Sequence, residues 1–157
     1  MRVLGVDPGT SVTGYGVVET GNGAGLGRLV ECGVIRFNGR SALPARLHEL
    51  HAQISDLIAR HRPSALALEN AFYHRNVHTT LVLGHARGVI LLAAAQAGLA
   101  IEEYPPATIK KTVAGAGGAP KAQVGSVVAR LLRLKHAPRP ADAADGVAVA
   151  LAYILRT

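Results

Sequence analysis

Several residue types are scarce in this sequence, and each scarcity excludes a class of protein. The single cysteine, Cys32, excludes a disulfide framework and a thiolate zinc site. The longest apolar stretch, 88–101, is too short to cross a bilayer. Only four apolar residues separate Arg2 from Asp7, which is not the layout of a signal peptide. We therefore expect a cytoplasmic protein without a membrane segment.

Acidic residues are also scarce, and the basic residues are unevenly placed. The 157 residues include 10 acids against 17 lysines and arginines, which gives a formal net charge of +7. The segment between Tyr104 and Ala141 has no acid, and the rest of the chain is balanced. The net charge thus lies in one segment, which favours contact with a polyanion such as a nucleic-acid backbone. The alternative is a basic, solvated surface.

Four of the ten acids border the most apolar segments of the chain. Asp7 ends the run 3–6, Glu69 ends the run 65–68, and Asp142 and Asp145 open the run 146–152. Carboxylates are rarely buried unless they are paired or bound to a cation, and a cluster of them repels itself. Carboxylate oxygens suit hard divalent cations such as Mg²⁺. The pattern therefore predicts one metal site.

Each of these acids also has a plain structural explanation. Asp7 can cap a turn formed with Pro8 and Gly9, and Glu69 can end a strand in solvent. Asp142 can be a helix N-cap, and Asp145 can interact favourably with the helix dipole. All four together, in a chain with few acids and a basic flank, favour the metal site.

Hydrophobic periodicity predicts an α/β protein in which a mixed, five-stranded sheet carries helices on both faces. The whole chain, 1–157, is expected to form one domain. The helix expected over 79–97 is apolar nearly all round, so its outer face is expected to meet a second subunit. The expected strands are 2–6, 14–19, 29–37, 65–69 and 99–104, and the long helices are 44–61, 79–97, 121–134 and 141–155.

The order of these elements brings the four acids together. Asp7 and Glu69 fall at the carboxyl ends of strands, where α/β folds build their sites. Asp142 and Asp145 are three residues apart and share one face of a helix. Such a cluster can hold two divalent ions about 4 Å apart and direct water at a phosphodiester. The sequence thus predicts two-metal phosphate chemistry, with Mg²⁺ as the ion and Mn²⁺ as an alternative.

Two further groups of residues are candidates for contact with nucleic acid. Lys110, Lys111 and Lys121 lie in the acid-free segment and are suited to bind phosphate. Phe72 and Tyr73 are adjacent aromatics in a polar loop that also holds Arg75, and they can stack on unpaired bases. The alternative for the aromatics is a hydrophobic staple onto the helix that follows.

Six short motifs resemble the RuvC family of Holliday junction resolvases. They match in order and spacing nearly from end to end of the chain. The motifs are Gly5-Val6-Asp7-Pro8-Gly9, Thr13-Gly14-Tyr15-Gly16, Leu68-Glu69-Asn70-Ala71-Phe72, Gly84-His85-Ala86-Arg87-Gly88, Lys110-Lys111-Thr112-Val113 and Asp142-Ala143-Ala144-Asp145.

The resemblance implies an RNase H-like fold, a homodimer and Mg²⁺-dependent paired nicking of four-way DNA junctions, in cooperation with a branch-migration motor complex. The four acids match the family's catalytic acids by position. Phe72 matches its junction-stacking aromatic, and Lys110 and Lys121 match its phosphate-binding lysines.

Three other functions stay open at this point. The Asp-x-Gly-Thr turn at 7–10 also occurs in ATP-handling proteins of the actin, heat-shock chaperone and sugar-kinase group, which need two such domains. A DNA-binding module with a degenerate site is a second alternative, although all four acids are retained. The third is another RNase H-like nuclease, acting on RNA hybrids or other branched DNA.

Overall fold

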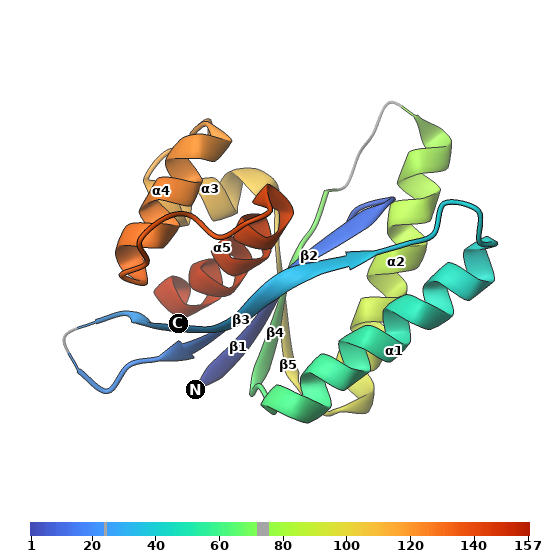
Figure 1. Ribbon diagram of the computed structural model, residues 1–157, viewed down its shortest axis with the longest axis horizontal. Coiled ribbons are helices and arrows are strands. Elements are labelled where there is room, and N and C mark those ends of the chain that lie inside the picture. Colours follow the sequence, from blue (N-terminus) through green and yellow to red (C-terminus); the bar gives the residue numbers. More distant parts are fainter. Residues whose placement is uncertain (24, 72–75) are drawn as a thin grey trace.

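The computed structural model describes residues 1–23, 25–71 and 76–157. Its described part contains a five-stranded mixed sheet with the order β3-β2-β1-β4-β5 (Figure 1). The first three strands form an antiparallel meander, and β4 and β5 are parallel to β1. The strands are β1 (Arg2–Asp7), β2 (Val12–Thr20), β3 (Gly27–Arg36), β4 (Ala65–Glu69) and β5 (Ala100–Tyr104).

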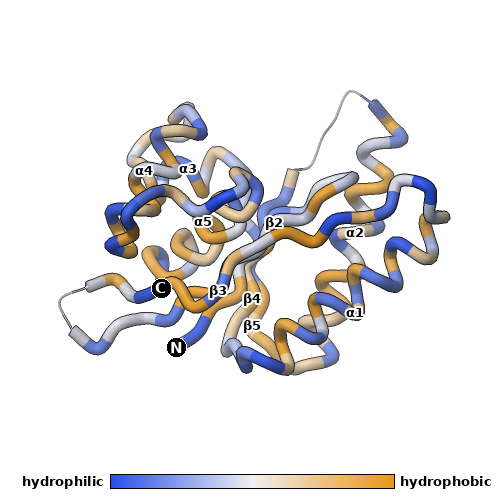
Figure 2. Tube along the Cα trace, viewed as in Figure 1, coloured by the Kyte–Doolittle hydropathy of each residue, from blue (hydrophilic) through white to orange (hydrophobic). Residues whose placement is uncertain are grey.

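Helices cover both faces of this sheet, as the sequence predicts (Figure 1). One face carries α1 and α2, and the other carries α3, α4 and α5, so two hydrophobic cores form. In Figure 2 the central strands are mostly hydrophobic, whereas α1 alternates between hydrophobic and hydrophilic turns. The helices are α1 (Leu43–His61), α2 (Val77–Gln96), α3 (Pro106–Ala114), α4 (Lys121–Leu131) and α5 (Ala141–Arg156).

The α5 helix lies unusually close to the sheet because glycines line the contact. A Cβ on Gly16 would stand 2.7 Å from the Cα of Val147, and one on Gly5 would stand 2.3 Å from the carbonyl oxygen of Gly146. Real side chains do not fit at such distances, so these positions accept only glycine without a shift of the helix. Backbone thus lies against backbone, and the first turn of α5 is brought to the ends of β1 and β2.

The α4 helix is shorter than predicted. It ends at Leu131, whereas the hydrophobic pattern predicts a helix as far as Leu134. Arg133 adopts a left-handed conformation with φ of 55°, which an α-helix cannot continue through. Leu132 is still buried, so the apolar periodicity continues past the helix end and conceals it.

The α2 helix buries one face and leaves the other exposed in this chain. Ala86 and Ile90 pack in the core, whereas the side chains of Val77, Leu81 and Leu92 are 72%, 58% and 52% exposed. By length and composition alone α2 could also cross a membrane, which corrects the sequence estimate based on the shorter stretch 88–101. One face of α2, which includes the fully buried Ile90, packs in the core, and 28% of the candidate span is buried.

Candidate active site

Two of the four acids are placed by adjacent parallel strands. Val6 of β1 pairs with Leu68 of β4, so the residues that follow them, Asp7 and Glu69, emerge side by side at the carboxyl end of the sheet. This is the edge at which open α/β sheets bind their ligands. The sequence prediction that these two carboxylates meet is therefore confirmed by the register of the strands.

The other two acids come from the first turn and a half of α5. Asp142 lines a cavity of about 530 Å³ together with Asp7 and Glu69, and we refer to it as the Asp142 cavity. Asp145 lines an adjoining cavity of about 200 Å³, again with Asp7 and Glu69, and this is the Asp145 cavity. The Asp7–Glu69 pair thus lines both cavities. All four predicted acids gather at one place in the fold.

The acids affect one another's ionisation. Burial, a hydrogen bond to Glu69, and repulsion by the charges of Glu69 and Asp145 raise the pKa of Asp7 far above its ordinary value. Burial also raises the pKa of Asp145, although the ammonium group of Lys121 acts in the opposite direction. Crowding of the carboxylates therefore disfavours the ionised form of Asp7, which hydrogen-bonds Glu69. A raised pKa of this kind is characteristic of carboxylates crowded at low dielectric.

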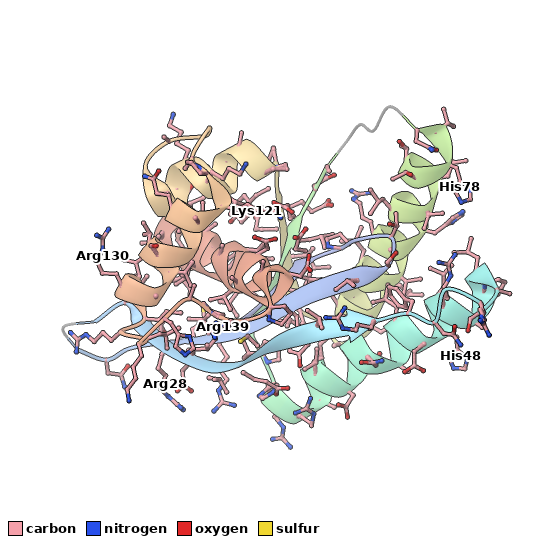
Figure 3. The ribbon with its side chains drawn as sticks, turned by 45° about the horizontal axis from the view of Figure 1, so that its top comes forward. Arg28, His48, His78, Lys121, Arg130 and Arg139 are labelled. Carbon is pink, nitrogen blue, oxygen red and sulfur yellow. The ribbon has the colours of Figure 1, made fainter. Side chains whose placement is uncertain are left out.

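Lys121 compensates for part of the negative charge. Its Nζ lies 3.3 Å from Oδ2 of Asp145, and attraction by Asp145 raises the pKa of the lysine. The lysine side chain is 72% exposed, so it can turn toward another anion at small cost. Figure 3 shows Lys121 near the carboxyl ends of the central strands, apart from Arg28 and Arg130.

The donor set fits a hard divalent cation. Among residues 1–23, 25–71 and 76–157, no three His, Cys, Asp or Glu side chains lie close enough to hold an ion as they stand. The acids instead surround the two cavities, where Asp7 hydrogen-bonds Glu69 and the ammonium group of Lys121 lies against Asp145. Carboxylate oxygens with open positions for water or phosphate are what Mg²⁺ prefers. A cation bound here would offset the repulsion that raises the pKa of Asp7.

The predicted DNA-contacting residues fall into three groups. Lys110 and Lys121 both line the Asp145 cavity, so the structure brings these two lysines to the acids. Lys111 is exposed on α3 and lines neither cavity. Phe72, Tyr73 and Arg75 lie outside the described residues.

Sequence reasoning missed a polar network in the wall of the Asp142 cavity. Arg87 of α2 and Asn70 both line this cavity, and both hydrogen-bond Glu103 of β5. Asn70 directly follows Glu69, and Arg87 lies in the motif Gly84-His85-Ala86-Arg87-Gly88, so each had a local signal of a role. Arg87 and Glu103 are 16 residues apart with no periodic relation, so only the fold reveals that they meet.

A third hollow, of about 290 Å³, extends the site along the start of α5. Lys121 and Asp145 line one end, and His136 and Arg139 add two further basic groups. All three basic residues belong to the segment without acids. Part of the positive charge predicted from composition thus lies beside the acids, which fits an extended anion that continues past them.

Comparison with known families and relatives gives one consistent result. Residues 3–153 match the family model described as crossover junction endodeoxyribonuclease RuvC. The RuvC protein of Halorhodospira halophila is 49% identical over 152 residues, which cover 97% of this chain and 89% of the relative. That of Pelotomaculum thermopropionicum is 46% identical over 154 residues, which cover 98% and 92%.

Solved structures agree with this result. Thermus thermophilus RuvC superposes with a TM-score of 0.91 at 35% identity, covering 99% of this chain and 94% of that one. The same protein in complex with a Holliday junction substrate gives a TM-score of 0.89 at 32% identity, with the same coverage. A yeast mitochondrial Holliday junction resolvase shares the fold alone, with a TM-score of 0.72 at 13% identity, 98% of this chain and 78% of that one. The chain therefore belongs to the RuvC family of crossover junction endodeoxyribonucleases.

Proposed function

We propose that this chain is a metal-dependent endonuclease that resolves four-way (Holliday) DNA junctions by paired symmetric nicks, in homologous recombination and DNA repair. The observation that carries the proposal is the gathering of Asp7, Glu69, Asp142 and Asp145 beside Lys121 in a chain of this family. The working unit is one nuclease domain spanning 1–157, and its compartment is the cytoplasm.

The four acids would hold two Mg²⁺ ions, with Mn²⁺ as an alternative. When bound, such ions lower the pKa of an attacking water and stabilise the leaving oxygen of a phosphodiester. The part played by the chain is to present the carboxylates of Asp7 and Glu69 side by side at the carboxyl end of the sheet. Asp142 and Asp145, on the first turns of α5, would complete the donor set.

Lys110 and Lys121 would bind and orient the phosphate. Both line the Asp145 cavity, and Lys121 is free to exchange its contact with Asp145 for a phosphate oxygen. That exchange removes a cation from Asp145 at the moment when an anionic substrate arrives. A positioned cation near a phosphate also offsets the charge that develops during its cleavage.

The remaining contacts would follow the DNA backbone and the junction centre. Lys111 is proposed to contact phosphate outside the cavities, because it is exposed on α3. Phe72, Tyr73 and Arg75 are proposed to reach the junction centre, where the aromatics stack on unpaired bases. This part of the proposal rests on their position in the chain, directly after Glu69.

Two copies of the chain would work together. The exposed apolar side chains on α2 are the proposed homodimer contact, because a two-fold axis matches the symmetry of a four-way junction. Two sites related by such an axis nick two strands of like polarity, which leaves ligatable ends. The branch-migration motor complex is a proposed partner that comes from the family resemblance alone.

The experiment compares three substrates with one enzyme preparation. Cleavage of a synthetic four-way junction is measured with Mg²⁺ and with Mn²⁺, next to a linear duplex and an RNA–DNA hybrid. Symmetric paired nicks in the junction alone support the proposal. Preferential cleavage of the hybrid would instead indicate a different RNase H-like nuclease, and binding without nicks in either metal would indicate a binding module.

A further inference from the structure

A fifth acid, Glu103, stands beside the four that we propose as metal ligands. It lies on β5, and its strand neighbour across the ladder is Leu68, the residue before Glu69. Its carboxylate accepts two hydrogen bonds from Arg87, 2.6 Å from Nε to Oε1 and 2.8 Å from Nη2 to Oε2. This fork-to-fork geometry is the strongest and most directional contact that a carboxylate makes with a side chain.

The same carboxylate also holds the residue that follows Glu69. Nδ2 of Asn70 donates to Oε1 of Glu103 at 3.3 Å, and the backbone N–H of Asn70 donates to the carbonyl oxygen of Tyr104 at 2.8 Å. Asn70 is only 6% exposed. It is thus tied to β5 through both its backbone and its side chain, directly after Glu69 in the chain.

Charge gives the pair a second effect. Arg87 lines the Asp142 cavity together with Asn70, so the arginine of the pair lies in the wall of the space that the metal ions would occupy. Arg87 balances the negative charge of Glu103, which would otherwise stand uncompensated near the four acids. A free carboxylate at that point could also draw an ion away from the four acids.

We infer that Arg87 and Glu103 are a positioning pair for the nuclease site: the arginine fixes Glu103, Glu103 fixes Asn70 and with it Glu69, and the paired Glu103 is withheld from the metal ions. This inference rests on the proposed function. The occupied atoms of Arg87 point to positioning through Glu103, because Nε and Nη2 already donate to the carboxylate. A direct contact between Arg87 and the scissile phosphate is the competing explanation.

Four variants separate these explanations. Arg87→Gln frees Glu103, Glu103→Gln keeps an acceptor for Asn70 without charge, and Arg87→Gln/Glu103→Gln leaves a neutral pair. Arg60→Gln is the matched control, because Arg60 also makes two ion pairs from a helix but at a distance from the site, with Asp56 and Glu31. Melting temperature is measured for each protein without metal, so that loss of fold is recognised.

Three readouts are needed besides melting. They are the single-turnover cleavage rate at saturating junction, junction affinity with Ca²⁺ in place of Mg²⁺, and Mn²⁺ affinity by calorimetry without DNA. We expect Arg87→Gln to slow cleavage by about tenfold and to weaken Mn²⁺ binding, with junction affinity unchanged. The double variant is expected to regain a large part of both losses, because it removes the stray charge. Arg60→Gln is expected to match the wild type.

Three results would overturn the inference. The first is a double variant whose cleavage and Mn²⁺ binding are no better than those of Arg87→Gln, and the second is an Arg87→Gln protein with unchanged cleavage and Mn²⁺ binding. The third is a loss of junction affinity in Arg87→Gln that parallels its loss of cleavage, which would indicate direct DNA contact. If Arg87→Gln does not fold, Arg87→Lys takes its place, since lysine keeps the charge but cannot form the two-pronged contact. The proposed function is tested separately by wild-type cleavage, and calorimetry reports on the pair whether or not the junction is cut.

Discussion

Gly14 of β2 lies directly under the carbonyl group of Asp142 at the start of α5. A Cβ on Gly14 would stand 1.8 Å from that oxygen, well inside the distance at which atoms overlap. The residue that carries one of the four acids therefore rests on bare strand backbone. The depth at which α5 is seated sets how far Asp142 reaches toward Asp7 and Glu69.

The first prediction follows from this contact. Gly14→Ala is expected to push the first turn of α5 away from the sheet, with a loss of about 1–3 kcal/mol in the free energy of unfolding. Cleavage is expected to fall further than stability explains, because Asp142 and Asp145 move together. Gly39→Ala is the control, since a Cβ there meets nothing within 4 Å. Denaturant unfolding measures the loss of stability, and single-turnover cleavage measures the loss of activity. A Gly14→Ala protein that cleaves at the wild-type rate would show that the close contact between Gly14 and α5 does not position Asp142.

The second prediction concerns the pH dependence of stability without divalent ions. Because the folded-state pKa of Asp7 is raised, its contribution to stability is full below the ordinary carboxyl pKa and is lost as pH rises toward the folded value. The wild type should therefore lose stability from about pH 4 upward relative to Asp7→Asn, which carries no charge at this position.

Thermal unfolding in a chelator, from pH 4 to pH 9, measures this difference. Mg²⁺ is expected to stabilise the wild type more than Asp7→Asn, because an ion that binds only the folded state raises its stability by mass action. A constant difference between the two proteins across the whole pH range would contradict the assignment of the raised pKa to Asp7.

The third prediction concerns the polar network around Glu31, which lies far from the four acids of the candidate site. Partial burial raises the pKa of Glu31, but hydrogen bonds from Arg60, His61 and Tyr15 outweigh it, so the pKa lies below its usual value. A lowered carboxyl pKa stabilises the fold above the unfolded value, and this contribution is lost as pH falls through the folded one. Glu31→Gln should therefore have a lower melting temperature than the wild type at pH 7 and the same melting temperature at the acid end of the range. Asp56→Asn, which changes an exposed acid, is the control.

The fourth prediction contrasts two lysines. Lys121→Ala is expected to reduce the cleavage rate of bound junction by about tenfold or more, because Lys121 lines the cavity with the acids. Lys111→Ala is expected to weaken junction binding and to lower its salt dependence, with little change in the rate once bound. Rates at saturating enzyme and affinities at several salt concentrations separate the two effects. Equal behaviour of the two variants would remove Lys121 from the site.

The fifth prediction tests the proposed dimer. Leu81 is exposed and apolar on α2, so Leu81→Glu is expected to give a folded monomer. Sedimentation measures the mass, and a junction with two labelled strands reports whether nicks are paired. Leu155→Glu is the control, because Leu155 is also an exposed leucine but lies on α5. This variant should remain dimeric. A wild type that sediments as a monomer at micromolar concentration would contradict the role given to α2.

The order and type of the elements could be predicted from the sequence because each follows a local pattern. The run 65–68 predicts a buried strand, and it is one; the position of Glu69 at its end follows directly. The convergence of Asp7 with Glu69 was predictable too, since both end parallel strands at the same edge of the sheet. The structure gives no test of the chemical roles assigned to these acids, which remain predictions.

Other features depend on long-range contacts that no local pattern contains. The pairing of Arg87 with Glu103 joins a helix to a strand, and the seating of α5 on Gly14 joins residues 128 positions apart in the chain. The early end of α4 depends on the left-handed conformation of Arg133, which the continuing apolar pattern conceals. Lys111 carries the same charge as Lys110 but points elsewhere, because neighbouring residues on a helix face different directions.

The most direct test of the central claim is junction cleavage by Asp7→Asn beside Asp56→Asn, with Mg²⁺ and with Mn²⁺. Asp56 is an exposed acid on α1 that pairs with Arg60, so its variant controls for the loss of one negative charge. We predict that Asp7→Asn binds the junction with wild-type affinity but loses at least about a hundredfold in cleavage rate, while Asp56→Asn keeps both. Cleavage by Asp7→Asn within a few-fold of the wild type would contradict the account, because the four carboxylates could not then be the catalytic metal site.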